Sequence, residues 1–400
     1  MRYFGLDIGR DFAHVAVVDG SGPARQLPRL AMGEQFRAFA GALGPDDAVA
    51  IEASTNTWTL ADLLGVHAGR VIVSNPLRTK AIASAKRKTD DIDAATLAEL
   101  LAADYLPPVW QPDATTRRLR RLVSHRAGLV RDRTAARNRV AAVLARRLVR
   151  PPATDLFGVR GRTWLATLEL PLEERLALDA ALRLDTALSA EVEAAERAIA
   201  AVIVDDPRVR RLLTIPGIGL VSAASILAVI GDVERFERPA KLVSYLGLDP
   251  RVRQSGDRPA MRGHISRAGQ AHARGLLCEA AHSAVRSPGP LAGFHARIKA
   301  RRGAAVAIVA TARKLAVLVW HVLTSGENCR YGPPARVALK HRQLDRLAGR
   351  ERTRPSQRGA TGFSHDRSRA RLRGGDDPHH PALRQAIDRV HPDLTSASGA

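Results

Sequence analysis

Short apolar runs alternate with amphipathic stretches along the first hundred residues of the chain. Apolar residues typical of strands gather at residues 3–6, 14–18, 48–51 and 71–73. Helical spacing of apolar residues marks residues 34–43, 57–64 and 93–103. The first two strand-like runs predict a β-hairpin. The alternation of strands and helices predicts an α/β domain with a mixed sheet over residues 1–110.

The rest of the chain has helical periodicity. Residues 111–205 contain two long amphipathic stretches separated by Pro151-Pro152, and they predict an antiparallel or oligomerising coiled coil. Residues 206–290 and 291–350 are also mainly helical. Residues 351–400 are rich in Arg, Gly, Pro, His and Ser and have few large apolar residues, which predicts a disordered basic tail.

Arginine is concentrated in the first of the two long helical stretches. A solvated helix face would explain such a run, but like charges in a row more often bind a polyanion. We therefore predict nucleic-acid contacts for Arg117, Arg118, Arg121, Arg131 and Arg137.

The overall charge favours the same partner. The chain has 400 residues and a formal net charge of +22, which attracts a polyanion through counterion release. A membrane is the competing partner, but no uninterrupted apolar run reaches the ~18 residues of a spanning helix, since Arg313-Lys314 breaks the run 304–323. The chain begins in a strand pattern without signal-peptide features, and its two cysteines lack metal-ligand spacing. We expect a cytoplasmic, nucleoid-associated protein.

Four carboxylates carry the candidate chemistry of the N-terminal domain. Asp7 follows the first strand-like run, Glu52 ends the third, and Asp90 and Asp93 open a helix three residues apart on one face. In an RNase H-like fold these four positions meet at one edge of the sheet. Clustered acids repel one another unless divalent cations neutralise them, so the set predicts Mg²⁺ or Mn²⁺ and phosphoryl transfer. Taken singly, each could be a turn or helix-start residue, as we expect for Asp11, Asp19 and Asp91.

Two glycine motifs allow more than one interpretation. Pro216-Gly217-Ile218-Gly219 resembles the turn of a helix-hairpin-helix element, in which Gly217 and Gly219 would let backbone amides approach a phosphate. A tight turn between helices without a ligand explains it about as well. The strand Gly5-Leu6-Asp7-Ile8-Gly9 is also how actin-like sugar kinases and chaperone ATPases begin. Those proteins need a second phosphate loop and an adenosine pocket, whereas residues from 115 onward are helical and basic.

The order of motifs resembles the IS110 family of insertion-sequence transposases, to which pilin-gene invertases belong. In the first domain the resemblance is carried by residues 5–9, Ile51-Glu52-Ala53-Ser54, Asn75-Pro76 and residues 88–94. Downstream it is carried by residues 215–219, 236–241, 245–250, Ser255-Gly256 and residues 263–269. It extends from residue 1 to about residue 349, and Gln270 stands where the family usually has asparagine.

The resemblance implies roles for individual residues. It assigns the acidic tetrad of a RuvC-like DEDD domain to Asp7, Glu52, Asp90 and Asp93, and a nucleophilic serine to Ser255. It implies Mg²⁺-dependent cleavage and rejoining of DNA through a serine–DNA intermediate. It further implies a structured guide RNA encoded by the element, which pairs with donor and target DNA, and assembly as a dimer of dimers.

The residues around Ser255 are compatible with that chemistry. A Ser-Gly pair is usually only a turn, and a serine hydroxyl needs a base or a metal to become a nucleophile. Ser266 is the competing serine, but we expect it to cap a helix. Phosphate-binding arginines are expected at Arg253, Arg258, Arg262, Arg267 and Arg274. The alternative function is a DNA-junction or RNA-binding module with a vestigial acidic site.

Overall fold

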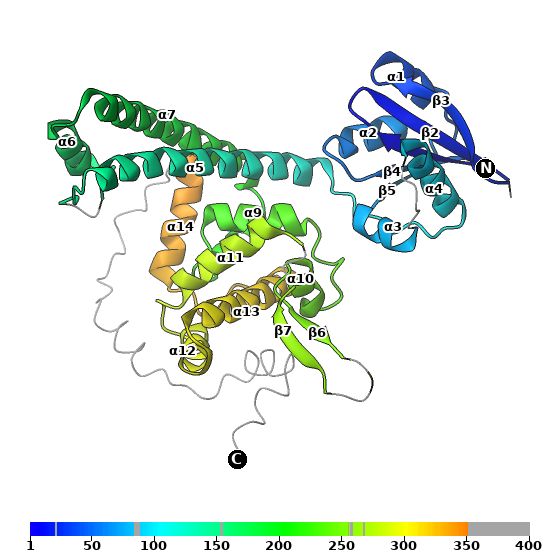
Figure 1. Cartoon of the computed structure of the whole chain (residues 1–400). Coiled ribbons are helices and arrows are strands. Elements are labelled where there is room, and N and C mark those ends of the chain that lie inside the picture. Colours follow the sequence, from blue (N-terminus) through cyan, green and yellow to red (C-terminus); the bar gives the residue numbers. More distant parts are fainter. Residues whose placement is uncertain are drawn as a thin grey trace. The chain divides into compact units, whose positions relative to one another are not determined.

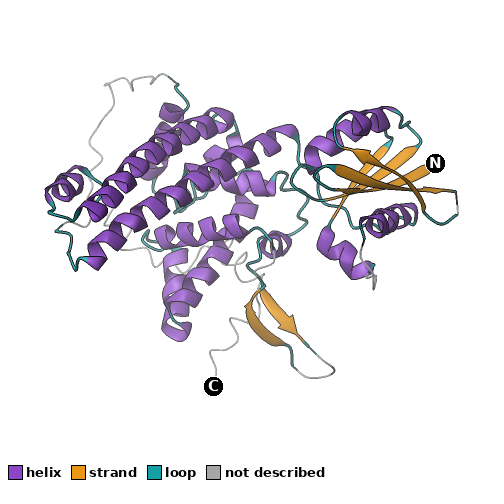
Figure 2. Ribbon diagram, turned by 45° about the horizontal axis from the view of Figure 1, so that its top comes forward, coloured by secondary structure: helices purple, strands orange, loops and turns teal. Residues whose placement is uncertain are grey.

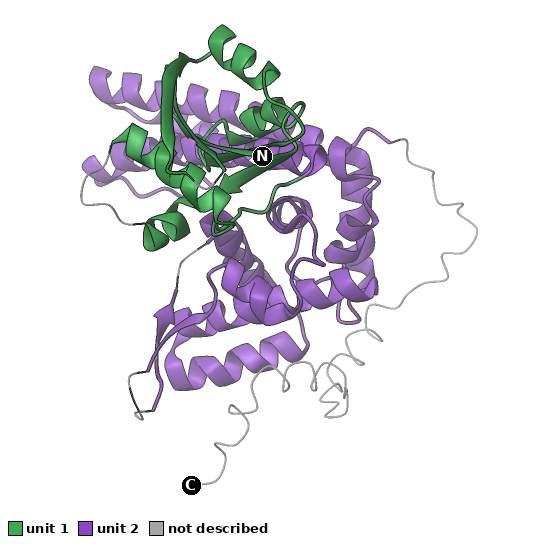
Figure 3. Ribbon diagram, turned by 90° about the vertical axis from the view of Figure 1, so that its right-hand side faces the viewer, with its two compact units in different colours: residues 1–112 green, residues 113–400 purple. Residues whose placement is uncertain are grey.

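The computed structural model describes residues 1–20, 22–83, 89–152, 155–254, 256, 259–266 and 269–350. The chain divides into two compact units, Met1–Pro112 and Asp113–Ala400 (Figure 3). The first unit ends two residues after the boundary that we expected. The predicted tail, residues 351–400, lies outside the described residues.

Unit 1 is built on a mixed sheet, as predicted, and this sheet has five strands where four were expected. Its strands are β1 (Arg2–Ile8), β2 (Phe12–Asp19), β3 (Arg25–Ala31), β4 (Asp47–Glu52) and β5 (Arg70–Ser74), in the order β3-β2-β1-β4-β5. β1 pairs antiparallel with β2 and parallel with β4. β3 was not predicted from the sequence. It is an edge strand containing Pro28 and several polar residues, so it lacks the apolar alternation of a buried strand.

Side-chain alternation gives the sheet two different faces. On one face, Leu6 and Ile51 pack with apolar side chains of α1 (Glu34–Gly41) and α2 (Thr57–Leu64). The other face presents small residues, including Ala16 and Ala50, to α4 (Asp90–Ala102). A short helix, α3 (Pro76–Ile82), follows β5, and Figure 2 shows the strands of unit 1 with helices beside them. Small residues on the second face allow the helix to approach the strands closely.

Helix α4 packs tightly against the sheet at Gly5. A Cβ atom at this position would lie 2.1 Å from the carbonyl oxygen of Ala94 and 2.4 Å from the amide nitrogen of Ala98. No other residue fits there without moving the helix. The glycine of the Gly-Leu-Asp motif therefore serves packing, and it fixes α4 over β1.

Unit 2 begins with a long antiparallel helical hairpin. Its arms are α5 (Ala114–Arg146) and α7 (Leu172–Ile203), joined through α6 (Val159–Thr167), and they lie side by side in Figure 1. Ion pairs cross between the arms, with Arg126 on Glu196 at 2.6 Å near one end and Arg146 on Glu174 at 2.7 Å near the other. Residue numbers increase along α5 from Arg126 to Arg146 while those of their partners on α7 decrease from Glu196 to Glu174, so the two helices run antiparallel.

The remaining helices of unit 2 share one apolar core with the base of this hairpin. They are α8 (Pro207–Leu213), α9 (Leu220–Ile230), α10 (Pro239–Tyr245), α11 (Ala271–Ala284), α12 (Pro290–Arg302), α13 (Ala304–Ser325) and α14 (Pro334–Leu347). A hairpin of two strands, β6 (Pro250–Arg253) and β7 (Met261–Ile265), interrupts them. This hairpin was not predicted, because its strands are short, polar and largely exposed.

Helix α13 lies at the centre of that core. By length and composition alone it could cross a membrane. Ten of its residues are nevertheless buried against the rest of unit 2, among them Leu315, Ala316 and Val319. Its apolar character is thus explained by its place in the protein interior.

Candidate acidic site and basic surfaces

Asp7 and Glu52 lie at the carboxyl ends of two neighbouring parallel strands. The strands are in register at Leu6 and Ile51, the residues just before them. Since Leu6 and Ile51 face α1 and α2, their successors face α4 on the opposite side of the sheet. Both acidic residues are half-buried. The fold therefore brings together, at one sheet edge and on one face, two carboxylates that are 45 positions apart in the sequence.

The first turn of α4 brings the other two predicted acids to the same face. Thr89 caps the helix by accepting a hydrogen bond from the backbone N–H of Ile92 at 3.3 Å. Asp93 precedes Ala94, which lies against Gly5, and it is half-buried, while Asp90 is exposed. Negative charge at a helix N-terminus is favourable because of the unpaired N–H groups there. The start of α4 is thus a favourable place for Asp90 and Asp93.

Two residues that the sequence analysis did not select also belong to this edge. His14 pairs with Asp7 across β1 and β2, and its Nδ1 lies 2.7 Å from Oδ1 of Asp91. Its Nε2 lies 3.6 Å from Oδ2 of Asp90. The side chain of Gln26, on β3, donates to the backbone oxygen of Asp91 at 2.6 Å. Asp91 is therefore an anchor of α4. The alternation of His14 with Ala16 and Val18 could have shown that His14 lies on the face that α4 covers, but not that Asp91 is its partner.

The donor chemistry of this edge suits a hard divalent cation, since all four predicted groups are carboxylates. Within the ranges that the structure describes, however, no three His, Cys, Asp or Glu side chains are arranged to hold a metal by themselves. Mg²⁺ commonly binds through one or two carboxylates and completes its coordination with water and substrate phosphate oxygens. The edge fits a site of that open kind better than an all-protein cage.

The predicted nucleophile belongs to the connection between β6 and β7. Ser255, Arg258 and Arg267 lie outside the described residues, as does the side chain of Arg262. The base of the hairpin is held by Ser266, whose hydroxyl donates to Oδ1 of Asp249 at 2.9 Å. The expectation that Ser266 caps a helix is wrong, because α11 begins at Ala271 after Gln270.

The arginines predicted to bind nucleic acid divide into two groups. Arg118, Arg121 and Arg131 on α5 and Arg253 at the end of β6 are exposed, while Arg117 is half-buried. Two others have structural partners. Nε of Arg137 donates to Oδ1 of buried Asp185 at 2.6 Å, and Arg274 donates to the backbone oxygen of Leu246 at 3.2 Å. Arg137 and Arg274 thus hold other parts of the fold in place, whereas the exposed arginines can contact a polyanion.

The Pro-Gly-Ile-Gly turn joins α8 to α9, and its two glycines differ. Gly217 has φ +85°, and a Cβ atom there would lie 2.1 Å from the carbonyl oxygen of Ala280 on α11. Gly219 precedes α9, and a Cβ atom there would meet nothing within 4 Å. Gly217 therefore serves the close packing of the turn on α11, and only Gly219 has open space of the kind a phosphate would need.

A lysine from α14 supports the residues that lead into this turn. Nζ of Lys340 donates to the backbone oxygens of Leu213 at 2.8 Å and Ile215 at 3.1 Å. Leu213 is the last residue of α8, and the carbonyl oxygen of Ile215 also accepts a hydrogen bond from the backbone N–H of Ile218 at 3.2 Å. Burial lowers the pKa of Lys340 from 10.5 to about 8. Of its charged neighbours, Cys329 raises this pKa and Arg336 lowers it.

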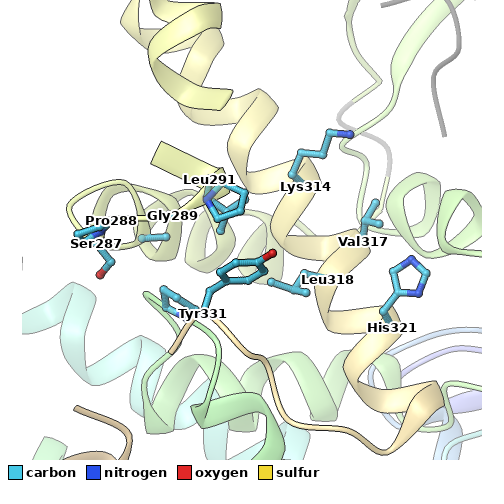
Figure 4. Close-up of a pocket in the computed structure, with 12 residues that line it drawn as sticks. Ser287, Pro288, Gly289, Leu291, Lys314, Val317, Leu318, His321 and Tyr331 are labelled. Carbon is cyan, nitrogen blue, oxygen red and sulfur yellow. The ribbon is translucent and has the colours of Figure 1, made fainter. Parts of the chain in front are cut away.

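A largely apolar pocket lies beside Pro216, the first residue of the turn. Its walls come from Pro216, the segment 287–291, α13 and Tyr331, and the ring of Tyr331 points into it (Figure 4). Lys314 and His321 provide polar groups on the α13 side. Burial lowers the pKa of His321. None of the site residues predicted from the sequence lines this pocket.

Comparison with known proteins matches both units. A model of the DEDD transposase domain of the IS110 type matches residues 4–147, and a model described as the transposase IS116/IS110/IS902 family matches residues 209–296. A probable family 20 transposase of Pseudomonas aeruginosa is 31% identical over 340 residues, which cover 81% of this chain and 97% of that protein. The transposase of insertion element IS1328 from Yersinia enterocolitica is 26% identical, covering 80% and 96%. The pilin gene-inverting protein of Moraxella lacunata is 29% identical, covering 57% and 64%.

Proposed function

This chain belongs to the IS116/IS110/IS902 family of transposases, enzymes that cleave and rejoin DNA strands, and on that premise we propose a mechanism for it. In this proposal Asp7, Glu52, Asp90 and Asp93 hold Mg²⁺ or Mn²⁺, and Ser255 is the nucleophile. A structured RNA encoded by the element guides the enzyme to donor and target DNA. The active assembly is a homo-oligomer, a dimer or a tetramer.

One observation carries the metal part of the proposal. Asp7 and Glu52 end neighbouring parallel strands on the face that α4 covers, and α4 begins with Asp90 and Asp93. Three elements thus contribute carboxylates to one sheet edge. When bound, a divalent ion would polarise the scissile phosphate and stabilise the oxygen that leaves. The protein residues would hold that ion open to the phosphate, as the incomplete protein ligand set requires.

The serine step exchanges one phosphodiester bond for another. Oγ of Ser255 would attack phosphorus and lose its proton, while the bond to one deoxyribose oxygen breaks and that oxygen is protonated on departure. The phosphoserine–DNA diester retains the bond energy, so a hydroxyl of another strand can attack it without a nucleotide cofactor. The exposed Arg253, which ends β6 before Ser255, would bind phosphate near the reacting group.

The serine assignment is tested by trapping the covalent adduct. Purified protein is mixed with the element's noncoding RNA, donor DNA, target DNA and Mg²⁺, and denaturing gels show whether protein migrates with labelled DNA. Wild type and Ser266→Ala should form the adduct, and Ser255→Ala should not. An adduct that persists in Ser255→Ala and disappears in Ser266→Ala would transfer the role to the other serine. Omission of the RNA tests the guide separately and should abolish adduct formation at the programmed target.

The metal assignment needs an acidic control. Asp7→Asn should reduce DNA cleavage by at least about 100-fold at saturating Mg²⁺, because it removes a ligand of the reacting centre. Asp11→Asn removes an equal charge from an exposed position in the turn between β1 and β2 and should leave cleavage near the wild-type rate. Equal activity of the two variants would contradict the acidic site.

A further inference from the structure

The first turn of α4 is held to the sheet by side chains from two other strands. His14 on β2 reaches Asp91 at 2.7 Å, and Gln26 on β3 binds the backbone oxygen of the same residue at 2.6 Å. In the tautomer with its hydrogen on Nδ1, His14 donates this hydrogen bond to Oδ1 of Asp91. We call the contacts of His14 and Gln26 with Asp91 the α4 latch.

The latch acts on the side of α4 away from Glu52. At 100° per residue, Asp91 shares the side of the helix that includes Ala98 and Ala102, which pack with residues of β2. Asp93 lies on the side of Leu97 and Leu100, which pack with residues of β4. Contacts on the β2 side therefore set the rotation of the helix that brings Asp93 toward the strand ending in Glu52.

The carboxylates in and near this turn also repel one another. Asp90, Asp91 and Asp93 lie within four residues, and Asp7 is the direct cross-strand partner of His14. Carboxylates that approach one another without a cation repel. In the absence of a favourable contact, this repulsion would lift the first turn away from the strand ends. The His14 donor offsets the repulsion where it acts on the helix.

From this geometry we propose that His14 is a positioning residue of the acidic site. Through Asp91, and with Gln26, it fixes the first turn of α4 so that Asp90 and Asp93 face the strand ends of Asp7 and Glu52. The inference rests on the proposed function of the four carboxylates, but the latch itself is a structural statement that can be tested without activity.

The experiment compares three variants of the full-length protein. His14→Ala removes the donor, His14→Asn places an amide donor where Nδ1 stands, and Glu99→Gln removes one charge from an exposed position later in α4. Amide hydrogen exchange is followed over residues 90–94. DNA cleavage is measured against Mg²⁺ concentration, and DNA affinity is measured separately.

The latch predicts faster exchange of residues 90–94 in His14→Ala, with wild-type exchange in His14→Asn and Glu99→Gln. It also predicts that His14→Ala needs roughly 10–100-fold more Mg²⁺ for half-maximal cleavage, as is typical when a group that orients a metal ligand is lost. DNA affinity should be unchanged. Recovery of the Mg²⁺ midpoint in His14→Asn distinguishes positioning from a general loss of stability.

Two results would overturn the proposal in different ways. Unchanged exchange in His14→Ala would exclude the latch itself. Faster exchange with an unchanged Mg²⁺ midpoint would exclude its role in the acidic site. If Asp7→Asn also cleaved normally, the proposed acidic site would have failed, and the exchange data would still decide the latch.

A double variant provides a second route. If His14 acts only through Asp91, the Mg²⁺ midpoint of the double variant His14→Ala/Asp91→Ala should equal that of Asp91→Ala alone. Additive shifts in the double variant would contradict a shared contact.

Discussion

Gly5 lets helix α4 lie directly on strand β1, because a Cβ atom there would stand 2.1 Å from the carbonyl oxygen of Ala94. Lys340 acts at a similar scale in unit 2, where one amine binds the carbonyl oxygen of Leu213, the last residue of α8, and that of Ile215, just before the turn. Each residue places an element that carries a predicted functional group: α4 carries Asp90 and Asp93, and α8 leads into the turn with Gly219. Single side chains, or their absence, thus control the geometry of larger elements.

Substitution of Gly5 by alanine should lower the free energy of unfolding by about 3 kcal/mol, since the helix must shift to admit the methyl group. DNA cleavage should fall as well, because the shift moves the carboxylates of α4. Gly41→Ala is the matched control: a Cβ atom at Gly41 meets nothing within 4 Å, so stability should hold or rise slightly. Urea denaturation measures the free energy of unfolding of both variants. A Gly5→Ala protein as stable as wild type would contradict the close packing.

The lowered pKa of Lys340 predicts a pH-dependent contribution to stability. Its pKa is about 8 in the fold and 10.5 ordinarily, so between these pH values the unfolded chain binds more protons. Stability from this group therefore rises as pH increases from 8 to 10.5 and is lost as pH falls through 8. The stability of wild type relative to Lys340→Met should rise over that range by on the order of 1 kcal/mol, after allowance for solvent screening. Lys241→Met, at an exposed position, should show no such trend.

The long hairpin of α5 and α7 combines two uses of arginine on one helix. Arg126, Arg137 and Arg146 pair with acids of α7 and hold the arms in register. Asp185 is buried and receives both Arg137 and Arg162, which links α6 to the hairpin. Arg118, Arg121 and Arg131 remain exposed. Helix α5 therefore stabilises the hairpin through one set of arginines and presents a cationic surface through another.

The division of roles on α5 can be tested with two substitutions of the same type. Arg137→Gln should lower stability by about 2 kcal/mol, because Asp185 loses a charged hydrogen-bond donor, and should leave DNA affinity nearly unchanged. Arg131→Gln should leave stability unchanged and reduce the slope of log affinity against log salt by roughly one unit. Thermal melts and fluorescence anisotropy at several salt concentrations provide the readouts. The reverse pattern would assign nucleic-acid binding to Arg137.

At the scale of the whole molecule, the positive charge belongs mainly to the first 350 residues. Residues 351–400 contain nine basic and six acidic residues, a net contribution of +3 to the total of +22. Both family models also end well before this segment, at residues 147 and 296. The polyanion attraction expected from the charge therefore resides mainly in residues 1–350.

Truncation after Arg350 should preserve DNA binding. The shortened protein keeps a formal charge of +19 from the total of +22, so its salt slope should change by less than about two units. The cut must follow Arg350, because this residue pairs with Asp205. Loss of most DNA affinity on truncation would show that the tail is a principal binding segment.

The sequence alone determined the features that depend on local pattern. Short apolar runs and the helical spacing of apolar residues were sufficient to predict the β1–β2 hairpin, β4 and the helices that cover the sheet. Strands buried on both faces are apolar along most of their length, and helices buried on one face keep a period of 3.6 residues. The apolar pattern did not reveal β3 or the β6–β7 hairpin, whose exposed strands bury too little to leave such a pattern. The order of the four carboxylates was visible for the same reason, since each lies beside a periodic element.

Only the tertiary structure decided which polar groups meet. His14 and Asp91 are 77 positions apart, and Arg137 and Asp185 are 48 apart, so no local spacing distinguishes them from other polar residues. The sequence made Gly217 a candidate for phosphate binding, whereas the fold presses it against α11. Hydrogen bonds and close contacts depend on distances that are fixed only after the helices and strands have packed. The segments that connect two elements determine neither the distance between the elements nor their rotation about their own axes.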